Sequence, residues 1–141
     1  MTKSILEIAK ETRREVMGQD YIDKLDSEYN DFNREFLEEI ALTNVWGRSW
    51  SRGVLSHREL SLINIAMLIA LGRTAEFKLH FRNALLRTHV PIEALREILI
   101  HVSVYCGVPA GRTAFEVAEQ VMREAGIDPS KLKIPPVGAK V

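Results

Sequence analysis

Apolar residues recur along this chain at intervals of three and four, the spacing of amphipathic helices, without the alternation of a β-strand. Glycine, proline and short polar stretches separate the apolar segments. The pattern predicts an all-α, single-domain bundle of about six helices. The expected helices cover residues 3–17, 31–42, 56–71, 75–86, 91–107 and 110–125, with a short further segment over 21–25.

The helix expected over 56–71 has a clear start signal and an apolar surface. Ser56 and Glu59 form the S-x-x-E pattern of a capping box, and Gly72 supplies a stop. Apolar residues lie on nearly every side of the segment between these signals, which predicts a central buried helix. The tail over 127–141 contains several prolines and is expected to be irregular.

The segment 43–55 is predicted to be an irregular connection. It holds both tryptophans, Trp46 and Trp50, together with Arg48 and Arg52. Two interpretations of the tryptophans stay open. They fold inward to cap the core, or they cover a pocket.

Composition narrows the function classes. The 141 residues fit one domain, 1–141, and 46% hydrophobic residues are enough to build a core. A formal net charge of +0 makes neither a nucleic acid nor an anionic membrane the default partner. The longest apolar stretch, 62–71, is too short to span a bilayer and is interrupted by Asn64. The charged N-terminus has no apolar signal region, so we expect a cytoplasmic protein.

Glu76 and His80 are the first candidates for chemistry. They are four residues apart and therefore project from one face of a helix, with Arg73 a further three residues before Glu76. A carboxylate next to an imidazole can fix its tautomer and raise its basicity. By spacing alone, a surface pair of little energetic weight is the favoured interpretation.

Neither the other histidines nor the cysteine forms a recognisable motif. The four histidines, His57, His80, His89 and His101, lack the spacing of a zinc site, and no metal is expected. Cys106 is the only cysteine, which excludes an internal disulfide and a C-x-x-C motif. It is interpreted as a small buried hydrophobe near a helix end, with a nucleophilic thiol as the alternative.

The stretch 45–118 resembles the carboxymuconolactone decarboxylase family. The resemblance is carried by W-G-R-S-W-S-R over 46–52, S-L-I-N-I-A-M-L-I-A-L-G-R over 61–73, E-F-K-L-H over 76–80 and Y-C-G-V-P-A over 105–110. The order and spacing of these blocks together are specific, and the family core is expected over about 30–126.

The resemblance implies an all-α subunit that assembles into a ring, typically a hexamer built from dimers or trimers, and that works without a cofactor. A related branch of alkylhydroperoxidase-like proteins has C-x-x-C followed four residues later by histidine. Aligned on His80, those cysteine positions are Arg73 and Glu76 here, so the resemblance implies that the peroxidase chemistry is absent and the histidine is kept.

The implied reaction is decarboxylation of 4-carboxymuconolactone, an anionic lactone, to 3-oxoadipate enol-lactone in the β-ketoadipate pathway of aromatic-acid breakdown. We assign proton transfer to His80, with Glu76 orienting the ring. One of four arginines is expected to bind a substrate carboxylate, and a tryptophan is expected near the departing CO2. The substrate-binding candidates are Arg73, Arg52, Arg48, Arg82, Trp46 and Trp50.

Several positions depart from the family pattern, and three alternative functions stay open. Leu60 stands where arginine is common, Ala75 replaces a frequent histidine, and Thr88 replaces a glycine. The first alternative is an enzyme of the same fold acting on another lactone or acid. The second is an antioxidant that depends on Cys106, and the third is a non-catalytic helical oligomer that binds a ligand.

Overall fold

The computed structural model describes residues 2–134 and Gly138, and all the regular secondary structure in that part of the chain is helical. The all-α fold predicted from the spacing of apolar residues is confirmed. In chain order the elements are α1 (Ile5–Met17), α2 (Gln19–Ser27), the π-helix η1 (Phe36–Trp50), α3 (His57–Ala70), α4 (Thr74–Leu86), α5 (Ile92–Cys106), α6 (Val108–Glu124) and the short 3-10 turn η2 (Pro129–Lys131).

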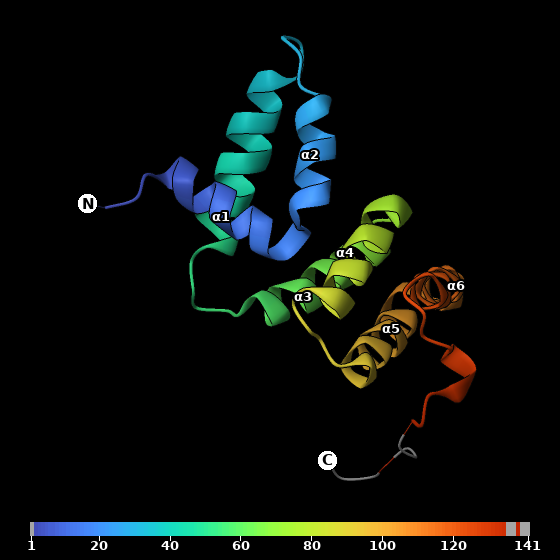
Figure 1. Ribbon diagram of the computed structural model, residues 1–141. Helices are drawn as coiled ribbons and strands as arrows, with labels where there is room; N and C mark the ends of the chain where they lie inside the picture. Colours follow the sequence, from blue (N-terminus) through green and yellow to red (C-terminus); the bar gives the residue numbers. More distant parts are fainter. Residues whose placement is uncertain (1, 135–137, 139–141) are drawn as a thin grey trace.

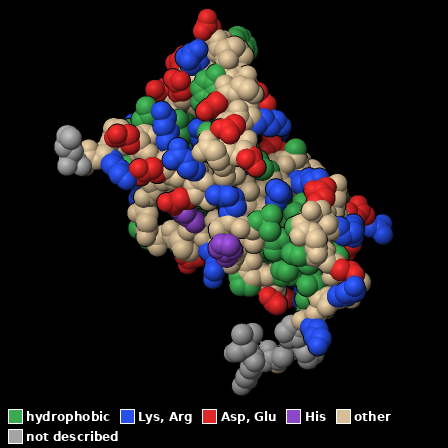
Figure 2. Space-filling model, in the orientation of Figure 1, with side chains coloured by type: hydrophobic (Ala, Val, Ile, Leu, Met, Phe, Trp, Pro, Cys, Tyr) green, Lys and Arg blue, Asp and Glu red, His purple; other side chains and the backbone are tan. Residues whose placement is uncertain are grey.

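The helices form two groups, each with its own core (Figure 1). In the first group α1 packs on η1, and α2 joins them; its buried cluster contains Leu42, Trp46 and Trp50. In the second group α3 packs on α4 and α5, and α6 covers α4 and α5. Charged side chains of both signs intermingle over the face shown in Figure 2.

The capping box predicted at Ser56 and Glu59 is confirmed. The Ser56 hydroxyl accepts a hydrogen bond from the Glu59 backbone N–H at 3.2 Å, and the Glu59 carboxylate accepts one from the Ser56 backbone N–H at 2.7 Å. These two bonds satisfy donors that the first turn of α3 would otherwise leave unpaired. They fix where α3 begins, and therefore which of its residues face η1.

The expectation that α3 is buried on all sides is wrong within this chain. Its buried residues are Ser61, Ile65 and Ile69, which lie on one face. Ile63 and Met67 are 44% and 51% exposed. The apolar surface of α3 therefore exceeds what the described part of the subunit covers.

The expectation of an irregular connection over 43–55 is wrong for 43–50 and confirmed for 51–55. The helix η1 continues to Trp50, and only the residues between it and α3 form turns and bends. Leu42, Trp46 and Trp50 are four residues apart, and all three are buried in one cluster. Gly47, which looks like a loop residue, is needed at a close crossing: a Cβ there would approach the Ile5 side chain and backbone to 3.0–3.1 Å.

Cys106 does not occupy the buried position expected for it. It is a free and exposed thiol at the last residue of α5. Its neighbours Val104 and Tyr105 are 75% and 80% exposed, so the last turn of α5 extends beyond the packed core. The tail is expected to be irregular over 127–141, and of these residues the structure describes 127–134 and Gly138. This part contains the short 3-10 turn η2.

The described residues contain neither a membrane-spanning helix nor a cluster of metal-binding side chains. None of the helices there is both long enough and apolar enough to cross a membrane. No group of three or more His, Cys, Asp or Glu side chains in the same part of the chain is arranged to hold a metal ion.

Candidate functional site

His80 lies on α4, the helix that connects the two cores. Phe77 and Phe81 of α4 pack into the core made with α5 and α6, whereas Leu79 packs against the cluster around the tryptophans. The His80 imidazole is partly buried and faces Trp50, with 6.2 Å between the ring centroids. Both tryptophans are buried, and their own rings lie 5.1 Å apart. The candidate site is thus built on packed helices, which can hold a side chain in a fixed position.

Asn64 on α3 provides the polar contact to the His80 ring. Its side-chain nitrogen Nδ2 lies 3.1 Å from His80 Nδ1. An amide N–H donates, so Nδ1 is the acceptor and the ring hydrogen is on Nε2. The contact therefore fixes both the tautomer and the orientation of the imidazole.

Burial keeps the His80 ring neutral. Loss of hydration lowers the pKa of His80 from the usual 6.5 to about 4, and the nearby negative charge of Glu76 opposes this shift without overcoming it. At neutral pH the imidazole is therefore uncharged, with one N–H donor at Nε2. A neutral N–H donor of this kind can stabilise negative charge that develops on a substrate during the reaction.

Glu76 acts on His80 through its charge. Its carboxylate lies 3.5 Å from the Arg73 guanidinium, and the two side chains are 49% and 63% exposed. An exposed pair of this kind contributes little to stability. The hydrogen bond to the imidazole expected from Glu76 is thus made by Asn64, which sequence reasoning did not select. Its one available signal was its place as a polar residue inside the apolar run 62–71.

A groove of about 360 Å³ lies between η1 and α3, and it includes both side chains that contact His80. Asn64 and Trp50 contribute to its wall. The rest is largely apolar, and Leu60 also lines it. Its other apolar wall residues are Ile40, Val45, Ile63 and Met67. The groove offers an apolar surface with the Asn64 amide in its wall, which suits an organic substrate. His80 is not itself a lining residue and adjoins the groove through its contacts with Asn64 and Trp50.

The four candidate arginines are exposed and none of them lines the groove. Arg48 comes nearest through a contact: its Nη1 donates to the Asn44 side-chain oxygen at 3.2 Å, and Asn44 lines the groove. Arg73 pairs with Glu76, Arg52 lies in the turn after η1, and Arg82 acts on Glu124 through its charge. The structure thus brings together His80, Trp50 and, by its charge, Glu76, and of the four arginines it pairs only Arg73 with one of these residues.

The carboxymuconolactone decarboxylase family model matches residues 38–120, a span that runs from η1 into α6 and includes every candidate site residue. The chain belongs to the carboxymuconolactone decarboxylase family. The resemblance seen in the sequence blocks is therefore confirmed.

Two relatives with similar sequences are named as decarboxylases. The chain is 38% identical over 122 residues to 4-carboxymuconolactone decarboxylase of Acinetobacter baylyi, covering 86% of this chain and 90% of that protein. It is 28% identical over 123 residues to nitrosuccinic acid decarboxylase of Metarhizium robertsii, covering 87% of this chain and 84% of that protein. The relatives share loss of CO2 and differ in the acid that loses it, so they support carboxy-lyase activity without fixing a substrate.

Asn64 leads to a first prediction. Asn64→Leu removes the donor to His80 Nδ1, so both tautomers become populated and we expect kcat for decarboxylation to fall by about tenfold or more. The ring ¹⁵N chemical shifts of His80 would report the change of tautomer, which a purely structural role of Asn64 would leave unaltered.

The matched control is Ser49→Leu. Ser49 also lines the groove, but its side chain is exposed and has no contact with His80. If both leucine variants lowered kcat equally and neither changed the His80 nitrogen shifts, Asn64 would have no positioning role.

Proposed function

We propose that this protein decarboxylates 4-carboxymuconolactone to 3-oxoadipate enol-lactone, without a cofactor, in the breakdown of protocatechuate. The observation that carries the proposal is the neutral His80 imidazole, held by Asn64 and Trp50 beside an apolar groove. The 38% identity to 4-carboxymuconolactone decarboxylase of Acinetobacter baylyi supports this choice of substrate.

The substrate supplies its own electron sink. When the bond between the ring carbon and the carboxylate breaks, CO2 leaves and the electron pair spreads through the ring C=C onto the oxygen of the lactone carbonyl. The product forms when one proton from solvent is added to the ring carbon next to that carbonyl. The protein must stabilise the transient oxyanion and deliver the proton.

His80 can perform both tasks in turn. Its Nε2–H donates to the developing oxyanion while the ring is neutral, so it does not hold the departing carboxylate by an ion pair and does not stabilise the ground state. Negative charge that develops next to the ring raises its pKa. Nε2 then passes its proton to the ring carbon while Nδ1 takes up a proton from solvent, with the Asn64 amide turned so that its oxygen accepts from the new Nδ1–H.

The remaining residues supply binding and exclusion of water. The groove walls from Trp50 and Ile63 provide apolar surroundings for the leaving CO2. Arg48, linked to the groove through Asn44, is the arginine we assign to the acetate arm of the substrate. Glu76 tunes the charge state of His80 and keeps Arg73 engaged.

We also propose that the protein works as a ring-shaped homo-oligomer, a hexamer or a trimer-based assembly. Ile40, Ile63 and Met67 border the groove and are 52%, 44% and 51% exposed. Another copy of the chain would bury these side chains and narrow the groove. Sedimentation as a monomer at the concentration used for activity assays would contradict this.

A second candidate is decarboxylation of a different acid, and one observation favours it. Leu60 lines the groove at the position where arginine is common in the family, so the groove wall lacks that cation. The nitrosuccinic acid decarboxylase of Metarhizium robertsii shows that a relative can act on a different acid.

The substrate proposal is tested by assaying CO2 release from both acids in parallel. We expect turnover of 4-carboxymuconolactone at a kcat/KM at least about tenfold above that for nitrosuccinate, the difference of one binding interaction. Turnover of nitrosuccinate alone would assign the second candidate. Turnover of neither acid by protein whose helical content is intact would contradict the proposed activity.

A further inference from the structure

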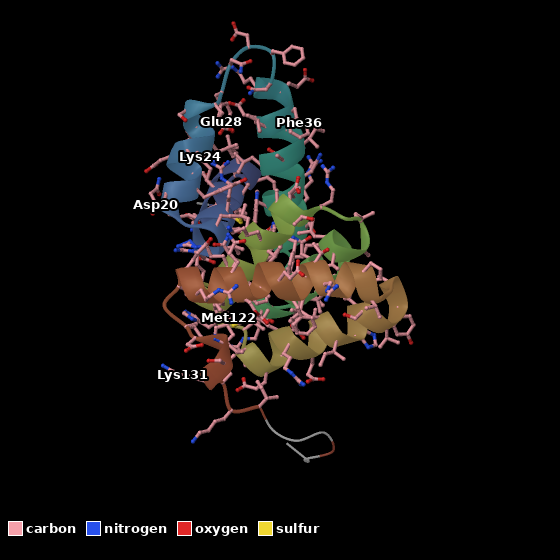
Figure 3. The ribbon with its side chains drawn as sticks, turned by 90° about the vertical axis from the view of Figure 1, so that its right-hand side faces the viewer. Asp20, Lys24, Glu28, Phe36, Met122 and Lys131 are labelled. Atoms are coloured by element: carbon pink, nitrogen blue, oxygen red, sulfur yellow. The ribbon has the colours of Figure 1, made fainter. Side chains whose placement is uncertain are left out.

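A second cavity, of about 500 Å³, lies between α1, α2 and the first half of η1. Figure 3 shows α2 and η1 side by side, with Glu28 and Phe36 at the ends of the two helices that meet at the connecting turn. Arg13 and Lys10 of α1, Asp26 of α2 and Glu38 of η1 contribute to the cavity wall. This cavity has no lining residue in common with the groove beside His80.

Arg13 is the unusual residue of this cavity. It is only 4% exposed, and its Nε has no hydrogen-bond acceptor among the described residues. Its one recorded ion pair, from Nη2 to the Asp26 carboxylate, is long at 3.8 Å, and the Asp26 side chain is 57% exposed. A buried guanidinium without close acceptors is costly, because its lost hydration is not replaced. Arg13 is therefore prepared for an anion that the chain itself does not supply.

The charges around Arg13 indicate how much negative charge the cavity can accept. Its lining contains four cationic side chains and two carboxylates, which leaves a surplus of two positive charges. The cations are Lys10, Arg13, Arg14 and Arg34, and the carboxylates are Asp26 and Glu38. Both carboxylates are partly exposed, and Arg34 meets Glu38 at 3.9 Å. An anion with two charges would balance this lining.

The apolar part of the lining favours an organic anion over an inorganic one. Leu6, Ile22 and Leu42 contribute aliphatic surface, and Tyr29 adds an aromatic ring. Inorganic phosphate would leave this surface uncovered, whereas a carbon chain between two carboxylates would cover it. A guanidinium also matches a carboxylate geometrically, since its N–H groups can donate in parallel pairs.

We propose that this cavity is a binding site for a small organic dicarboxylate, with Arg13 binding one carboxylate. The site is separate from the groove beside His80: Leu42 and Glu38 of η1 face this cavity, whereas Ile40, Asn44 and Val45 of the same helix line the groove. The inference does not depend on the proposed decarboxylase activity.

Calorimetric titration of the full chain with adipate tests the site. Adipate carries two carboxylates on a four-carbon link, and adipamide is its uncharged counterpart. We expect adipate to bind and adipamide to bind at least about tenfold more weakly. Inorganic phosphate is expected to bind more weakly than adipate; if phosphate bound as tightly, the assignment to an organic dicarboxylate would be wrong.

Variants locate the binding. Arg13→Met keeps most of the side-chain volume and removes the charge, and we expect adipate affinity to fall by about tenfold or more. The matched control is Arg112→Met on α6, an exposed arginine paired with Glu116, which should bind adipate as the wild type does. Asp26→Asn removes the carboxylate that competes for Arg13 and should tighten adipate binding; it also tests the site if Arg13→Met fails to fold.

His80→Ala separates this site from the groove. We expect it to bind adipate with wild-type affinity while losing decarboxylase activity. Loss of adipate binding in His80→Ala would place the anion in the groove and overturn the proposal. Unchanged binding in Arg13→Met, or no binding of adipate to the wild type, would overturn it as well.

Discussion

Replacing His80 with alanine is expected to lower kcat/KM for CO2 release by about 10²–10⁴-fold, the range for removal of a group that transfers a proton in the transition state. The variant loses the Nε2–H donor at the oxyanion and the route by which a proton reaches the ring carbon. Stopped assays of CO2 from 4-carboxymuconolactone, with circular dichroism to show an intact fold, would measure it.

His57→Ala is the matched control. The His57 ring also lies next to Trp50, with 6.1 Å between ring centroids, but among the described residues it makes no hydrogen bond to a residue of the groove wall, whereas His80 contacts Asn64. Its Nδ1 lies 3.6 Å from the Glu15 carboxylate on α1. We expect this variant to keep kcat/KM within about threefold of the wild type, since it alters packing at the same tryptophan without touching the reaction. Equal losses in the two variants would indicate that Trp50 packing, and not proton transfer, matters.

Glu76→Gln separates two ways in which a carboxylate could assist His80. A carboxylate that holds the ring would be as necessary as the histidine. The structure instead pairs Glu76 with Arg73 and leaves the ring contact to Asn64. We therefore expect Glu76→Gln to lower kcat by less than about tenfold, through loss of a charge that raises the pKa of His80.

Sequence reasoning predicted the parts of this protein that depend on local signals. The capping box at Ser56 and the apolar spacing gave the helices of the second group and the position of His80 on α4. It failed at η1, because Asn44, Gly47 and Ser49 are residues typical of loops. Asn44 and Ser49 are instead polar because they lie on the exposed face of η1, and Gly47 is small because η1 passes close to α1 there.

The candidate site was predicted only in part, for a physical reason. Spacing along one helix identifies His80 and Glu76 as neighbours, but it cannot show that Asn64, 16 residues away on another helix, reaches the ring. Nor can it show that burial controls the charge of His80. Which side chains of two helices touch, and how much water remains around them, depends on the angle at which the helices pack, and residue spacing along one helix does not give that angle.

The buried state of His80 should also make the protein less stable in acid. The pKa of His80 is about 4 in the folded chain, compared with 6.5 for an exposed histidine. Between these two pH values the unfolded chain binds a proton that the folded chain does not. The free energy of unfolding therefore decreases as the pH falls from 6.5 to 4, by up to about 3 kcal/mol from this one group.

His80→Gln isolates that contribution, because glutamine fills similar space and does not titrate. Carboxylates whose pKa is lowered in the fold, such as Glu59 and Glu124, also weaken the protein in acid, but they are present in both chains and cancel in the difference. Urea unfolding at several pH values would give the free energy of unfolding of each chain. We expect the wild type to lose stability relative to His80→Gln as the pH falls through this window. A wild-type minus His80→Gln difference that stays constant from pH 7 to 4 would mean that burial does not hold His80 neutral, and the neutral N–H donor proposed for the reaction would lose its basis.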